Sequence, residues 1–293
     1  MDRTIARIEA REKDKMSKRN LGEIQDDSMG ESDDEGEEDI TLKSNGDHAE
    51  SVEIDFVFTD PCEANFHSVR QLINTYLGAA SFDSSNLANI IVSQQSTGSM
   101  VCCDGETDVF GFITALSLSR YANESSMRQI LTLVQEKCPS DLKQTLNKIL
   151  STKLVGLVLN RRMINLPYQL VPHLHDALQQ DIDWAIENEL NQTLKDSYKF
   201  DYFLMLASVQ VDNSAAKKPA GKKAKGEYAE PSIKTFDNFE EEFLEAEAEL
   251  SFTFPTQNVL KEGAGISTEI TVILVERQKH RGTIANMKAM LAA

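Results

Sequence analysis

The run LVGLVL, residues 154–159, restricts the possible folds of this 293-residue chain more than any other segment. Consecutive apolar side chains indicate a strand that is covered on both faces, because a strand with one solvated face alternates apolar and polar residues. The run FDYFLMLASVQV, residues 200–211, has the same character. A helix is predicted to begin at Pro167, with Pro172 either tolerated in its first turn or marking a delayed start. Strands buried between helices predict an α/β domain.

Apolar periodicity predicts the remaining elements. VEIDFVF alternates like a strand, and TEITVILVE is a further strand near the end of the sequence. NFEEEFLEAEAEL is predicted to be a helix with Phe239, Phe243, Ala246 and Leu250 facing inward and the glutamates of EEE (240–242) on a solvated face. The predicted order is β-α-α-β-β-α-α-β-α-β-α-β-β-α. It favours a single mixed α/β domain over residues 51–293, with helices on both faces of one sheet.

Acidic residues dominate the charge, which is −17 overall. Residues 1–50 contain no aromatic residue and include DDSMGESDDEGEED, so we expect a disordered acidic tail. Ser28 and Ser32 each precede a glutamate by three positions, which makes them phosphorylation candidates. An acidic chain repels nucleic-acid backbones and anionic membrane surfaces, and it suits basic partners. No apolar run approaches the length of about 20 residues of a membrane helix, so membrane insertion is not expected.

A polar segment at residues 213–231 is predicted to be a flexible linker inside the domain. It is compatible with a solvated linker, a nucleic-acid contact or a nuclear import signal. Because the lysines are not interleaved with aromatic residues, a nuclear import signal is favoured over a nucleic-acid surface. The nuclear-import candidates are Lys217, Lys218, Lys222, Lys223 and Lys225.

Motifs of enzymes and metal sites are missing from the sequence. It contains no G-x-x-x-x-G-K-[ST], G-x-G-x-x-G, G-x-S-x-G or H-E-x-x-H pattern, and its four cysteines lack metal-ligand spacing. His173 and His175 are two positions apart, so a helix would place them on different faces. His67 and His280 are expected to be ordinary surface or helix-cap histidines. We therefore predict no catalytic residue, no cofactor and no metal ion.

Arg161 and Arg162 follow the buried strand at a position where many α/β proteins bind phosphate. Between Leu159 and Pro167 there is no glycine, although phosphate loops need glycine for close backbone approach. The two arginines could contact an anion or an acidic partner by charge alone. They could equally solvate the loop or pair with surface carboxylates.

Several blocks of this sequence resemble the BCCIP family, in the same order and with similar spacing. The most specific block is V-G-L-x-L-x-x-R-x-I-N-x-P within LVGLVLNRRMINLP, and VFGFITALSLS, YFLMLAS and NFEEEFLEAEAEL accompany it. The resemblance spans residues 52–293 and is interrupted at the lysine segment. It implies a fold of the acetyltransferase (GNAT-like) type without a coenzyme-binding loop, because NRRMIN replaces a glycine-containing loop. The short loop 104–108 departs from animal members of the family.

The resemblance also implies a function in protein binding. Family members escort clients, so we expect a non-enzymatic nuclear protein that chaperones a basic client, such as a large-subunit ribosomal protein, or exports clients. Nuclear transport receptors are expected partners, direct nucleic-acid binding is not, and shuttling to the cytoplasm is compatible with export. The alternatives are an adaptor in the cell cycle or in DNA repair, an export adaptor for a membrane-lipid kinase, and an acyl-CoA-dependent transferase.

Overall fold

A computed structural model describes most of the predicted domain. The described residues are 56–78, 80–94, 96–103, 106–212, 233–256 and 266–291. The predicted acidic tail with Ser28 and Ser32 lies outside the described residues, and so do the five lysines of the predicted linker.

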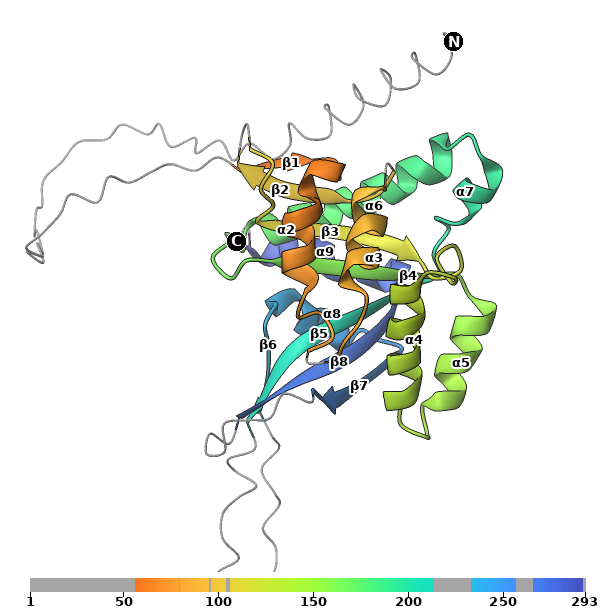
Figure 1. Ribbon diagram of the computed structural model, residues 1–293. Coiled ribbons are helices and arrows are strands. Elements are labelled where there is room, and N and C mark those ends of the chain that lie inside the picture. Colours follow the sequence, from red (N-terminus) through yellow and green to blue (C-terminus); the bar gives the residue numbers. More distant parts are fainter. Residues whose placement is uncertain are drawn as a thin grey trace, which may run out of the picture.

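The described residues form one sheet of eight strands (Figure 1). Seven strands follow one another in the order β1-β2-β3-β4-β5-β8-β7, and β6 pairs with β5 beside this path. The strands are β1 (Phe56–Thr59), β2 (Ser99–Cys103), β3 (Gly111–Ser117), β4 (Val155–Arg162), β5 (Tyr202–Asp212), β6 (Ile233–Phe236), β7 (Leu250–Pro255) and β8 (Ile266–Glu276).

The only parallel pairing among the described strands joins β4 to β5, and it is short. It runs from Val155↔Tyr202 to Leu157↔Leu204, although β4 continues for five residues and β5 for eight beyond these pairs. On the same side, β6 pairs with β5 only from Val209 onward. The two central strands therefore diverge, and we refer to the space beyond their last pair as the β4–β5 opening. Helix α8 lies beside this opening (Figure 1).

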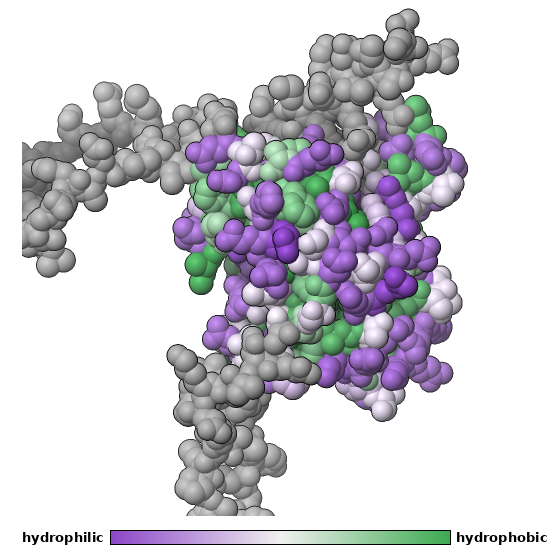
Figure 2. Space-filling view, viewed as in Figure 1, coloured by the Kyte–Doolittle hydropathy of each residue, from purple (hydrophilic) through white to green (hydrophobic). Residues whose placement is uncertain are grey.

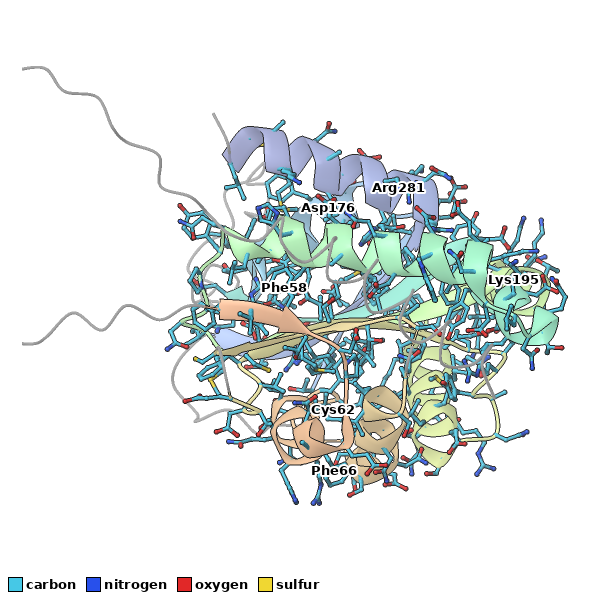
Figure 3. The ribbon with its side chains drawn as sticks, turned by 90° about the horizontal axis from the view of Figure 1, so that it is seen from above. Phe58, Cys62, Phe66, Asp176, Lys195 and Arg281 are labelled. Carbon is cyan, nitrogen blue, oxygen red and sulfur yellow. The ribbon has the colours of Figure 1, made fainter. Side chains whose placement is uncertain are left out.

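Helices cover both faces of the sheet (Figure 3). One face carries α2 (Phe66–Ile73), α3 (Ser84–Val92), α4 (Ser125–Lys137) and α5 (Lys143–Thr152). The other carries α6 (Leu170–Asn188), α8 (Phe239–Ala246) and α9 (Arg277–Leu291), and the short α7 (Gln192–Asp196) follows α6. We call these the first face and the second face.

Strand β4 alternates between the two faces. Leu157 and Leu159 belong to the apolar cluster of the first face, and Val158 belongs to that of the second face. A Cβ atom at Gly156 would lie 3.1 Å from the ring of Phe200, so a larger residue would require this ring to shift by a few tenths of an ångström. The predicted strand covered on both faces is therefore confirmed, together with the mixed α/β fold class.

The structure also differs from the sequence-based expectation in several elements. Strand β4 does not end at Leu159 but continues through Arg162, because its pairing with β3 extends to Gly111↔Arg162. Helix α6 begins at Leu170, so Pro172 falls in its first turn and marks a delayed start. The short elements β6 and α7 were not predicted, because four or five residues carry too little periodicity.

The predicted orientation of α8 is wrong for Phe243, Ala246 and two of the glutamates, whereas Phe239 does pack inward and Leu250 is buried as the first residue of β7. Leu244 is its fully buried apolar residue, whereas Phe243 is 39 % exposed. Glu240 and Glu241, which were expected on a solvated face, are 0 % and 3 % exposed. The physical reason for Glu240 is a set of buried polar partners on the second face, Arg162 and Asn160, whereas Glu241 accepts a hydrogen bond from Asn238 just before the helix.

Candidate functional site

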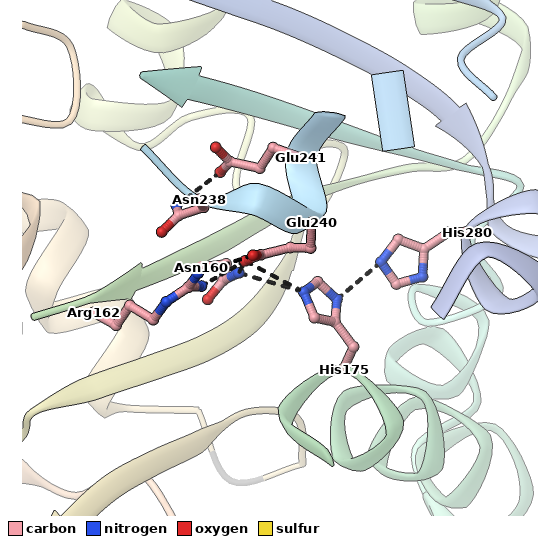
Figure 4. Close-up of polar contacts among 7 residues, drawn as sticks. All are labelled: Asn160, Arg162, His175, Asn238, Glu240, Glu241 and His280. Atoms are coloured by element: carbon pink, nitrogen blue, oxygen red, sulfur yellow. Dashed lines mark hydrogen bonds and ion pairs between the residues drawn. The ribbon is translucent and has the colours of Figure 1, made fainter. Parts of the chain in front are cut away.

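Buried polar side chains meet on the second face, at the β4–β5 opening (Figure 4). Arg162 at the end of β4 donates from Nη1 to Oε1 of Glu240 at 2.5 Å and from Nη2 to Oε2 at 2.8 Å. The Arg162 side chain is 9 % exposed and that of Glu240 is 0 % exposed. Such a bidentate pair between a guanidinium and a carboxylate is the strongest kind of side-chain hydrogen bonding, and here it attaches α8 to the sheet.

Two further side chains surround the Glu240 carboxylate. Asn160, two residues before Arg162 on the same face of β4, donates from Nδ2 to Oε1 of Glu240 at 2.6 Å. His175 on α6 places its Nε2 at 4.0 Å from the same oxygen. Its Nδ1 lies 3.1 Å from Nε2 of His280 on α9. Glu240 is therefore contacted from the strand and approached from one of the helices.

The contacts continue along α6 and α9. Nε2 of Gln179 lies 3.0 Å from Nδ1 of His280, and Nε of Arg277 donates to Oε1 of Gln179 at 3.2 Å. Asp183 accepts from Arg277 at 2.5 Å and also from Arg281. We call the set from Arg162 to Arg281 the second-face network. It joins the sheet, α6, α8 and α9 through hydrogen bonds between side chains.

The network indicates which ring nitrogen of neutral His280 carries the proton. Because Oε1 of Gln179 accepts from Arg277, the Gln179 amide nitrogen is the donor to Nδ1 of His280. Neutral His280 then carries its proton on Nε2 and donates to Nδ1 of His175. Nε2 of His175 lies 3.3 Å from Nδ2 of Asn160 and 4.0 Å from Oε1 of Glu240. Burial lowers the pKa of His280 well below 6.5, and the neighbouring His175, Arg277 and Arg281 lower it further. A neutral His280 agrees with this hydrogen-bond order.

The two buried glutamates of α8 differ in charge. Burial alone would raise the pKa of Glu240, but His175 and Arg162 outweigh it and lower that pKa from 4.5 to about 2. Burial and the Glu240 charge raise the pKa of Glu241 to about 8. Glu241 accepts from Nδ2 of Asn238 at 3.0 Å, while its Oε2 has no hydrogen-bond partner within the described residues. At neutral pH, Glu240 is an anion and Glu241 a neutral acid.

The structure places the two candidate arginines on opposite faces. Arg161 points to the first face, where its guanidinium lies 5.8 Å from the centre of the Tyr76 ring and its Nε donates to the Leu72 carbonyl at 3.5 Å. Arg162 points to the second face and pairs with Glu240. The two do not form one surface, and contact with an external anion or acidic partner stays a prediction.

Sequence reasoning missed most of this network. His280 was expected at the surface but is fully buried, because it lies between His175 and Gln179. The expectation that His173 and His175 occupy different faces is confirmed, since only His175 is buried. The one available signal was EEE in an otherwise amphipathic segment, and it reads equally well as a solvated face.

The geometry of the second-face network joins three helices to the sheet. Within the described ranges, no group of three or more His, Cys, Asp or Glu side chains is arranged to hold a metal ion. Two surface hollows of about 490 Å³ and 640 Å³ lie elsewhere, beside α4 and beside α7. No helix in the described part of the chain is both long and apolar enough to cross a bilayer.

Known proteins match this chain over most of its length. The family model named BCCIP matches residues 51–247. The BCCIP homolog of Arabidopsis thaliana is 31 % identical over 222 residues, which cover 73 % of this chain and 66 % of the relative, so this chain matches about two thirds of that protein. Protein bcp1 of Emericella nidulans is 28 % identical to this chain, and the match covers 94 % of this chain and 99 % of the relative.

A solved structure is also similar. The crystal structure of BCP1 from Saccharomyces cerevisiae superimposes with a TM-score of 0.58 and 17 % sequence identity, covering 81 % of this chain and 89 % of that one. At this identity the match supports the fold. Together with the family model and the relatives, it leads to one conclusion: this chain belongs to the BCCIP family.

Proposed function

We propose that this protein is a non-enzymatic nuclear escort that binds a basic client, such as a large-subunit ribosomal protein, and works with nuclear transport receptors. The observation that carries the non-enzymatic part is the ion pair that the chain's own α8 makes with the end of β4, beside the β4–β5 opening. The Glu240 carboxylate takes both arms of the Arg162 guanidinium there. The charge of Arg162, the cation of β4 that faces the second face, is thereby neutralised by a carboxylate of the same chain.

An acetyl-CoA pyrophosphate needs free cations or free backbone N–H groups at this point of the fold. In this chain, β4 stays paired with β3 up to Arg162, and the segment contains no glycine. Displacing Glu240 to free Arg162 would leave a buried carboxylate without its partner, which costs about 3–5 kcal/mol. These features disfavour coenzyme binding at this point of the fold and support the proposal that the fold serves to bind other proteins.

A basic client is supported by the distribution of charge. Residues 235–260 contain seven acidic residues and no lysine or arginine. Two of the seven are the buried Glu240 and Glu241, and Glu245 pairs with Lys234 at 2.6 Å. The others are exposed, and they are Asp237, Glu242, Glu247 and Glu249. Such a surface attracts a basic protein and competes with RNA for it.

Affinity purification of the full chain from nuclei, followed by mass spectrometry, tests this proposal. At low salt we expect basic ribosomal proteins to be enriched, and at high salt we expect them to be lost because screening weakens the attraction. A purified candidate client should then bind the purified chain directly. If neither ribosomal nor chromatin proteins of basic charge co-purify at low salt, the escort proposal fails.

The competing function is an acyl-CoA-dependent transferase, which the strand order alone favours. A thermal-shift titration separates the two. A ligand at 100 times its dissociation constant stabilises a protein by about 2.7 kcal/mol, so bound acetyl-CoA would raise the melting temperature clearly. We expect no shift. A saturable shift would reject the non-enzymatic proposal.

Nuclear localisation is a separate part of the proposal and has its own test. Replacing the five import-candidate lysines by alanine should abolish nuclear accumulation of a fluorescent fusion. Their replacement by arginine, which keeps the charge, is the matched control. Unchanged accumulation in the alanine variant would remove the role assigned to Lys217, Lys218, Lys222, Lys223 and Lys225.

A further inference from the structure

Most large apolar side chains that remain exposed gather at one end of the second face. The described residues contain eight such side chains, and only Leu190 and Ile233 are outside this group. We call the group the apolar ledge. It consists of Met163, Ile164 and Tyr168 in the β4–α6 loop, Phe243 on α8, and Met290 and Leu291 on α9. Figure 2 shows hydrophobic colour at the left edge, where Figure 1 places this loop.

Contacts between the elements hold the ledge together. Tyr168 packs edge-on against Phe239 of α8, with ring centres 6.4 Å apart. Lys288 donates to Asp176 at 2.7 Å, which holds the last turns of α9 beside the first turns of α6. Helix α8 also packs against α9. The β4–α6 loop, α8 and α9 are therefore neighbours at the ledge. The second-face network holds α8 and α9 in position against the sheet and α6.

Acidic side chains lie next to the ledge. Glu242 is exposed on α8 directly beside Phe243, and Asp237 is exposed just before the helix. One lysine of β6 and one of α9 are already paired, Lys234 with Glu245 and Lys288 with Asp176. The ledge thus combines methionine and aromatic surface, which adapts to many apolar partners, with an excess of negative charge.

We propose that the apolar ledge is the docking surface for a basic amphipathic helix of the client, whose apolar side chains cover the ledge while its basic side chains meet Asp237 and Glu242. This assignment rests on the proposed function, because it takes the client to be basic. A helix laid on a hydrophobic surface is a recurrent mode of recognition. A second copy of this chain is disfavoured, since it would bring the acidic α8 surfaces together, and an anionic membrane would repel them.

A labelled peptide tests the proposal with the full chain. The probe is a synthetic helix of about 18 residues, or about five turns, built from leucine and lysine at helical spacing. We expect fluorescence anisotropy to show that the double variant Ile164→Ser with Phe243→Ser binds it at least tenfold more weakly than the unaltered chain. The matched control is Leu190→Ser with Ile233→Ser, which removes the two exposed large apolar side chains outside the ledge and should change the affinity less than twofold.

Other results would overturn the assignment. Equal binding by the ledge variant and the unaltered chain would reject the ledge, and the escort function would stand if a purified basic client still bound. Equal binding of a leucine–glutamate peptide would reject the basic occupant. Self-association that is lost in the ledge variant, measured by light scattering, would assign the surface to a second copy. If the peptide behaves as expected but no basic protein co-purifies with the chain, the escort function is rejected, whereas the ledge stands as a docking surface for a basic helix.

Discussion

The two faces of the sheet are held together by different physics. On the first face, helices α2 to α5 pack through a large cluster of buried apolar side chains around Leu87, Ile91 and Leu146. On the second face, an apolar cluster of similar kind is crossed by charged and polar groups that run from Arg162 to Arg281. Apolar packing is non-directional, whereas the network requires each partner in one geometry. The first face therefore supplies stability, and the second also fixes the position of α8 and α9.

The sharpest way to break this comparison is to remove Glu240. The substitution Glu240→Ala leaves the buried Arg162 guanidinium and Asn160 without their acceptor, so we expect a loss of about 4 kcal/mol in the free energy of unfolding, measured by urea denaturation. Joint replacement by apolar residues of similar size, Glu240→Leu with Arg162→Met, should restore most of that stability. If the single substitution costs less than about 1 kcal/mol, the network does not hold α8.

A cavity on the first face should have the next largest effect. Ile91→Ala removes a fully buried side chain of α3 and should lower the free energy of unfolding by about 3 kcal/mol. The milder Ile91→Val should cost about 1 kcal/mol, in proportion to the methyl group removed. Binding of the basic peptide at the ledge should be unaffected as long as the chain is folded, because Ile91 packs in the apolar cluster of the first face and the ledge lies on the second face. Weaker binding by folded Ile91→Ala would contradict the separation of the two faces.

The neutral acid on α8 predicts a dependence on pH. The pKa of Glu241 is raised from 4.5 to about 8, so the folded chain keeps a proton that the unfolded chain loses above pH 4.5. Its contribution to stability is full below pH 4.5 and is lost as pH rises toward 8. Glu241→Gln removes this titration and should gain on the order of 2 kcal/mol relative to the unaltered chain between pH 5 and pH 8. A difference that stays constant over this range would show that Glu241 is ionised.

The smallest effect is expected at an exposed ion pair. Asp176 and Lys288 are 35 % and 46 % exposed, so water and salt screen their attraction. Asp176→Asn should lower the free energy of unfolding by about 0.5 kcal/mol or less. Compared with Glu240→Ala, this variant measures how much of the effect of a carboxylate depends on burial. A cost near that of Glu240→Ala would contradict the comparison.

Prediction from sequence succeeded where the hydrophobic pattern determines the structure. LVGLVL predicted a strand covered on both faces, and the order of the larger helices and strands followed from their periods. The hydrophobic pattern failed to predict the orientation of α8, because it cannot distinguish a buried glutamate from a solvated one. Only the position of Arg162, 78 residues away, distinguishes them. The burial of His280 was missed for the same reason, since its partner His175 lies 105 residues earlier in the sequence.

These sequence separations also bear on how the protein folds. Contacts among helices α2 to α5 join segments that are close in the sequence. The network instead forms only when segments 78 to 105 residues apart come together, which has a larger entropic cost. We therefore expect the first face to form early and α8 to dock late in folding. Substitutions at Glu240 should then speed unfolding more than they slow refolding, whereas Ile91→Ala should also slow refolding. The apolar ledge would be complete only in the last step, after the sheet has formed.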